Sequence, residues 1–151
     1  MLSASAAAFL SLASIAQEPA RGEVRTLEGD GSNPICLAGS IPAADTMWQA
    51  KIDASMIPGA QGAMLVLSAS PWPTGALDTD FGQVLIDPKT RIYNLNRSLN
   101  VDRVQFGIPV PNDPAVIGET YYAQALVYGQ TAYQLCNALE LRIGDAPPLR
   151  D

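Results

Sequence analysis

Proline and glycine recur every eight to twelve residues between Ile35 and Ile143, and they separate short apolar or alternating runs. The chain of 151 residues contains 12 glycines and 12 prolines. Proline breaks helices and sheet ladders, so the segments between these residues are short enough for strands and too short for long helices. Evenly spaced short runs bounded by turn residues predict an all-β fold, an antiparallel β-sandwich of Ig-like or jelly-roll-like type.

Four of the runs carry the clearest strand signals. Residues 47–54 alternate between polar and apolar side chains, which predicts a half-buried strand. The continuous apolar run at 63–69 predicts a central strand, and the run at 120–128, apolar on both faces, predicts another. Residues 104–110 also alternate, and Pro109 places that end of the strand at a sheet edge.

Turn chemistry predicts two of the connections. The tetrapeptide Asp-Pro-Lys-Thr at 87–90 lies between two apolar runs and predicts a β-hairpin. At 113–117 the sequence predicts one short helical turn, because Asp113 can cap it and Pro114 fits the first helical position.

The N-terminal segment predicts export. Residues 1–16 carry no charged side chain and end in the small-x-small pattern Ser-Ile-Ala that a signal peptidase accepts, so we expect a signal peptide cleaved after Ala16. A retained membrane anchor is the alternative, although the run is shorter than the about 20 residues of a span. We expect no membrane span in the mature chain, and a secreted, periplasmic or cell-surface location. The expected organisation is a signal peptide at 1–16, an exposed lead-in with an edge strand near Val24–Leu27 at 17–33, one β-sandwich domain at 34–144 and a flexible tail at 145–151.

The chain has two cysteines, Cys36 and Cys136, which in an exported protein are most simply interpreted as one disulfide. Two buried, unpaired thiols are the alternative. The alternation of the last predicted strand, 135–143, puts Cys136 on the same face as Glu140 and Arg142. A disulfide there is therefore expected at the rim of the sheet rather than in the core.

The composition excludes several kinds of chemistry. There is no histidine, so histidine-based catalysis is excluded, and two thiols alone leave zinc short of its usual four ligands. Neither lysine, Lys51 nor Lys89, lies in a Ser-x-x-Lys arrangement, and no glycine-rich phosphate loop is present. Asp78 and Asp80 lie in a turn-rich stretch that explains them without catalysis or calcium binding. We expect no enzyme activity, no metal and no cofactor, and the net charge of −6 disfavours nucleic acid as a partner.

Two features are candidates for binding. Trp72 lies between two prolines, where a rigid exposed indole can stack on a sugar ring; an indole folded over the end of the sandwich is the alternative. Trp48, in contrast, alternates with core residues and is expected to be buried. Residues 89–103 hold four basic side chains and one acidic one, a local charge of +3, which suits an acidic polysaccharide, a lipid headgroup or simply a solvated face.

Two C-terminal segments carry a resemblance. Residues 108–125 read IPVPNDPAVIGETYYAQA, and residues 137–144 read NALELRIG. The pattern resembles the end of a β-sandwich domain found in large secreted and surface proteins of planctomycetes and myxobacteria, except that Cys136 stands where serine is usual. The resemblance implies an exported all-β domain and no catalytic residue. Within it, Gln124 is placed to satisfy buried backbone groups between Tyr122 and Leu126.

These observations together predict an exported, non-catalytic structural or interaction domain of the cell envelope or extracellular space. One alternative is a carbohydrate-binding module that uses Trp72. Another is a self-assembling surface or filament subunit, in which Val24–Leu27 pairs with the open sheet edge of a neighbouring copy. The expected partners are a polysaccharide or another surface protein.

Overall fold

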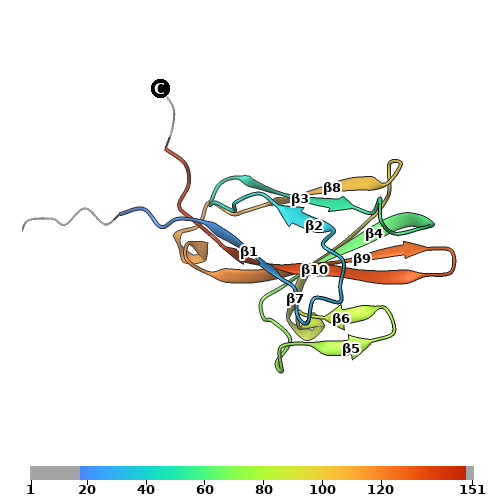
Figure 1. The fold of residues 1–151 in the computed structure, drawn as a ribbon. Helices are drawn as coiled ribbons and strands as arrows, with labels where there is room; N and C mark the ends of the chain where they lie inside the picture. The colour runs from blue at the N-terminus through green and yellow to red at the C-terminus, as the bar shows by residue number, and fades with distance from the viewer. Residues whose placement is uncertain (1–17, 149–151) are drawn as a thin grey trace, which may run out of the picture.

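The structure, a computed structural model, describes residues 18–148, so the predicted signal peptide lies outside the described residues. It consists of β-strands with two short 3₁₀ turns, η1 and η2 (Figure 1). In chain order the elements are β1 (Glu23–Leu27), β2 (Leu37–Gly39), β3 (Met47–Asp53), β4 (Ala60–Ser68), β5 (Leu77–Thr79), β6 (Gly82–Val84), η1 (Pro88–Thr90), β7 (Arg91–Ser98), β8 (Arg103–Pro109), η2 (Pro114–Val116), β9 (Thr120–Gly129) and β10 (Tyr133–Arg142).

Two antiparallel sheets form the sandwich, and the all-β prediction is confirmed. The larger has five strands in the order β1-β10-β9-β4-β7, and the smaller has three in the order β2-β3-β8. The two runs predicted as central strands, now β4 and β9, are each paired on both sides. β8 ends the smaller sheet, as Pro109 predicts, and β1 is an edge strand that pairs with β10 only. No helix in residues 18–148 is long and apolar enough to cross a membrane.

The core lies between the sheets, where the inward-facing side chains of each strand meet. Trp48 is 2% exposed, as predicted, and its indole nitrogen donates to the Ser40 carbonyl at 2.8 Å. The main core cluster comprises Cys36, Leu37, Trp48, Ala50, Ile52, Ala54, Ala63, Leu65, Leu67, Phe106, Ile108, Ala123, Ala125, Val127, Cys136, Leu139 and Leu141.

A small hairpin, β5 paired with β6, lies outside the sandwich on the side of the larger sheet (Figure 1). The segment that follows it packs against that sheet through a second apolar cluster around Leu85, Ile86 and Ala138. This hairpin gives the outer face of the larger sheet a cover that its apolar residues require.

The predicted hairpin around 87–90 is wrong. The Asp87 side chain accepts a hydrogen bond from the Lys89 amide and caps η1, so the chain turns away and runs on into β7. β7 then pairs with β4 rather than with β6. The predicted helical turn at 113–117 is confirmed as η2, and Asp113 caps it by accepting from the Ala115 amide at 2.9 Å.

Candidate functional site

A β-bulge in β10 sets the geometry of the most elaborate part of the molecule. Leu135 pairs with Leu126 and Ala138 with Gln124, so β10 advances three residues while β9 advances two. The extra residue reverses the alternation of β10. Cys136 therefore faces the core and is 0% exposed, which overturns its expected position at the rim of the sheet.

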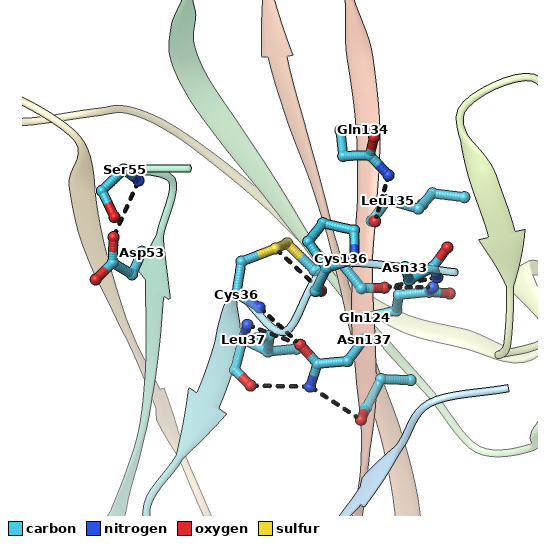
Figure 2. The surroundings of a disulfide bond; sticks show 12 residues. Asn33, Cys36, Leu37, Asp53, Ser55, Gln124, Gln134, Leu135, Cys136 and Asn137 are labelled. Carbon is cyan, nitrogen blue, oxygen red and sulfur yellow. Dashed lines mark hydrogen bonds between the residues drawn. A yellow bond between two sulfur atoms is a disulfide. The ribbon is translucent and has the colours of Figure 1, made fainter. Parts of the chain in front are cut away.

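The predicted disulfide between Cys36 and Cys136 is present (Figure 2). The two residues are 100 positions apart in the sequence and their Cα atoms are 5.4 Å apart. Cys36 directly precedes β2 of the smaller sheet, and Cys136 lies in the bulge of the larger sheet. The bond therefore fastens one layer of the sandwich to the other.

Asn137, the neighbour of Cys136, is fully buried and bonds to the chain that enters β2 (Figure 2). Its Oδ1 accepts from the amides of Cys36 at 3.0 Å and Leu37 at 2.9 Å, and its Nδ2 donates to the Leu37 carbonyl at 2.9 Å. The N–H and C=O of Leu37 are turned away from β3, and the Cys36 amide lies just before β2. The side-chain amide thus satisfies the free edge of β2 in place of a neighbouring strand.

The buried side-chain amides of Asn33 and Gln124 likewise bond to backbone groups in β6 and in the segment that follows it. Asn33 donates to the carbonyls of Gln83 at 2.8 Å and Cys136 at 3.0 Å, and it accepts from the Gln83 amide at 2.7 Å. Gln124 accepts from the Leu85 amide at 2.9 Å and donates to the same two carbonyls. The expectation that Gln124 satisfies buried backbone groups is confirmed. The groups belong to the hairpin segment and the bulge, not to its own strand.

We call Cys36, Cys136, Asn33, Gln124 and Asn137 the brace. It joins both sheets and the β5–β6 hairpin at one point. Its amides are neutral and are engaged in hydrogen bonds to backbone groups, so what the arrangement does is hold the chain in place. Within residues 18–148 no three Asp, Glu, Cys or His side chains gather where they could hold a metal ion.

The carboxylates singled out in the sequence lie in and beside the β5–β6 hairpin. Asp78 is in β5 and accepts a hydrogen bond from the Gln83 side chain at 2.7 Å, and Asp80 lies in the turn that follows. The Oε1 atom of the Gln83 side chain accepts a hydrogen bond from the Asp30 backbone N–H at 2.9 Å. Asp78 is thus tied into the hydrogen bonds that anchor the hairpin.

Trp72 lies before the β5–β6 hairpin and is half-buried. Its backbone nitrogen donates to the Leu85 carbonyl at 3.0 Å, and its carbonyl accepts from the Gly75 amide at 2.9 Å. The structure fixes the backbone on both sides of this indole but brings no other candidate binding residue to it.

The basic stretch 89–103 is split between the two sheets. Arg103 in β8 lies 3.4 Å from the Asp53 carboxylate. Hydrogen bonds from Ser55 lower the pKa of Asp53 below its usual value, and the charge of Arg103 lowers it further. Arg97 in β7 reaches across to β8, where its guanidinium lies 5.7 Å from the Phe106 ring centre and donates to the Gln105 carbonyl at 3.2 Å.

An apolar groove of about 160 Å³ is lined by residues of both sheets, among them residues of β7 and β8. Ile92 and Tyr93 of β7 line one wall, and Ile108 and Val110 line the other. Ile92 is 47% exposed and Tyr93 is 41% exposed. Sequence patterns did not predict this groove, because its walls come from strands of different sheets.

No family model matches this chain, and no curated protein matches it at a significant level. The resemblance to secreted planctomycete and myxobacterial domains therefore stays a prediction from the sequence.

Proposed function

We propose that this chain is an exported, non-catalytic structural or interaction domain of the cell envelope or extracellular space. The observation that carries the proposal is the brace. A disulfide that joins the two layers persists in oxidising compartments and is rare in the reducing cytosol. The buried polar side chains around it hold backbone groups, which suits a rigid unit that presents its surface to a partner.

Export and the state of the cysteines test this proposal together. We expect the chain outside the cytoplasmic membrane, beginning at Gln17, with no thiol that titrates after denaturation. A matched variant without residues 1–16 is expected to stay in the cytoplasm and to show both thiols. Full-length chain recovered from the cytoplasm with two free thiols contradicts the proposal.

A carbohydrate-binding module is the second candidate, and the fixed backbone around Trp72 favours it. Two hydrogen bonds fix the main chain of the half-buried Trp72, so its side chain stacks on a sugar ring with less loss of conformational entropy than one on a mobile loop. We expect retention on a polysaccharide column to be lost in Trp72→Ala and kept in Tyr133→Ala, which removes an exposed aromatic ring elsewhere. Equal retention of both variants contradicts this role of Trp72.

A further inference from the structure

β7 presents a free edge. It pairs with β4 alone, and the bond from the Leu99 amide to the Gln61 carbonyl fixes which residues bond to β4. By the alternation of an antiparallel ladder, the backbone groups of Tyr93, Leu95 and Arg97 face β4. The N–H and C=O groups of Asn94, Asn96 and Ser98 then point away from the sheet. The ladder is irregular at Ile92, which lies between the pairs Tyr93–Leu67 and Arg91–Ser68.

The inner face of β7 is also largely uncovered. The larger sheet has five strands and the smaller has three, and β8 is the last strand of the smaller sheet. Leu95 lies opposite Leu65, which is fully buried, so Leu95 and its inner-face neighbour Tyr93 point toward the space between the sheets. Yet Tyr93 remains 41% exposed. An added strand beside β7 would extend the sheet and cover these side chains.

The other sheet edges in residues 18–148 are poorer templates. The outward positions of β8 include Pro109, which has no N–H, and Gln105, whose carbonyl already accepts from Arg97. β1 is five residues long and turns the backbone of Glu23 and Arg25 outward, so charged residues stand at its free edge. β7 offers eight residues without proline or lysine.

The sequence of β7 is complementary to itself when two copies run antiparallel. Placing Asn94 opposite the partner's Asn96 lets the outward backbone groups of both residues pair in each copy, and the irregularity at Ile92 then lies at the two ends of the shared ladder, opposite the partner's Ser98. On the inner face this register sets Leu95 against the partner's Leu95. It also sets Tyr93 against the partner's Arg97, whose guanidinium is held in place over Phe106.

We propose that two copies of this chain associate through β7, antiparallel and about a two-fold axis at Leu95. The two five-stranded sheets become one continuous sheet, and the partner's strand covers Tyr93. The inference rests on the proposed function in so far as the domain acts through a protein surface, and it names a second copy as the partner. Arg91 and Arg97 of the two copies come near each other, so added salt is expected to strengthen the dimer by screening their repulsion.

Site-specific cross-linking of the oxidised, full chain tests the register. In the proposed pairing the two Leu95 positions form a non-hydrogen-bonded pair, with Cα atoms about 4.5 Å apart, within reach of a disulfide. The two Tyr93 positions are four residues out of register, about 13 Å along the strands. We expect Leu95→Cys to give a disulfide-linked dimer on a non-reducing gel and Tyr93→Cys to give none. The reverse result, or linkage in neither variant, overturns the register.

Sedimentation of the unaltered protein and of two edge variants tests the surface itself. We expect a reversible dimer. Asn94→Pro, which removes an outward N–H and leaves the bonds to β4 intact, should weaken it at least about tenfold. The matched variant Arg25→Pro alters the β1 edge and should leave the dimer unchanged. A monomer at all concentrations, or an open-ended polymer that Arg25→Pro abolishes, overturns the proposal.

The β7 dimer and the proposed exported role are contradicted by different results. A chain that is exported with its disulfide intact and sediments as a monomer overturns the β7 dimer only. A chain found in the cytoplasm with two free thiols overturns the exported role, whatever its state of association.

Discussion

Asn137 shows how one side chain can replace a strand. β2 is three residues long and has a neighbouring strand on one side only, so the backbone groups on its other side need partners inside the core. The Asn137 amide supplies both an acceptor and a donor in the spacing that a strand would provide. The identity of this residue therefore matters more than its size.

Asn137→Ala is expected to lower the free energy of unfolding by about 3 kcal/mol, because it leaves the buried N–H and C=O of Leu37 and the N–H of Cys36 without partners. Denaturant unfolding at neutral pH measures the change. The matched substitution Asn112→Ala, at an exposed position, is expected to change the stability by less than about 0.5 kcal/mol. Equal losses in both variants would contradict the role given to Asn137.

A second residue-scale prediction concerns acid. Hydrogen bonds from Ser55 hold the pKa of the Asp53 carboxyl below its usual value of about 3.9. The ionised Asp53 carboxylate therefore stabilises the folded state fully above the pKa of the unfolded chain. This contribution is lost as the pH falls through the lower pKa of the folded state. We expect Ser55→Ala to raise the Asp53 pKa, measured by NMR titration of the carboxyl carbon. Asp30 serves as the internal control, because hydrogen bonds from Ser32 lower its pKa in the same way and Ser55→Ala leaves those bonds untouched.

At the scale of elements, Tyr128, Gly62 and Asn96 tie three neighbouring strands together. The Tyr128 ring lies over Gly62 of β4, and its hydroxyl hydrogen-bonds to the Asn96 side chain of β7. A Cβ at position 62 would overlap the ring. Glycine at position 62 leaves room for the Tyr128 ring to lie across β4, so that its hydroxyl reaches the edge strand β7.

Gly62→Ala is expected to displace the Tyr128 ring, break its bond to Asn96 and cost about 1–2 kcal/mol of stability. Near-UV circular dichroism and denaturant unfolding report the two effects. Gly107→Ala is the control, because its added Cβ would press only on the flexible Met47 side chain and would be in ordinary contact with the Gln49 side chain, so a change within about 0.5 kcal/mol is expected. An unmoved Tyr128 signal in Gly62→Ala would argue against the packing described.

Most strands could be predicted from the sequence, and the exceptions have physical causes. Period-two alternation identifies β3 and β8, whose shared ladder is regular, and β9, because the extra residues in its two ladders lie in β10 and β4. It fails at Cys136, where one extra residue reverses the face of the chain, and nothing in the local sequence marks the bulge. The turn residues at 87–90 also misled the prediction. A hairpin and a 3₁₀ turn share the same Asp-Pro signal, and only the pairing of β7 with β4 decides between them.

The candidate site was predicted only in part for the same reason. Both cysteines and Gln124 were identified, but the partners of the amides lie far away in the sequence. Asn137 and Cys36 are 101 residues apart, and Asn33 and Cys136 are 103 apart. Such contacts follow from the topology, which no spacing rule encodes.

On the scale of the whole molecule, the brace joins the two sheets and the β5–β6 hairpin at one point. Removing the disulfide with Cys36→Ala and Cys136→Ala together is expected to cost about 4 kcal/mol, because the loop it closes spans 100 residues. Denaturant unfolding gives the loss, and reduction of the unaltered protein is expected to give a similar value. A loss below about 1 kcal/mol would mean that the core alone holds the sheets together.

The disulfide and the Asn137 amide act on the same few residues, so their effects should not add. With the disulfide intact, Asn137→Ala traps the Leu37 backbone against β10 with its polar groups unsatisfied. Without the disulfide, β2 can move away from β10, and water can reach those groups. We therefore expect the cost of Asn137→Ala to be smaller by about 1 kcal/mol or more in the Cys36→Ala/Cys136→Ala background. A double-mutant cycle measures this difference. Strict additivity would show that the two links stabilise the sandwich independently, and that β2 stays in place on its β3 pairing and core contacts alone.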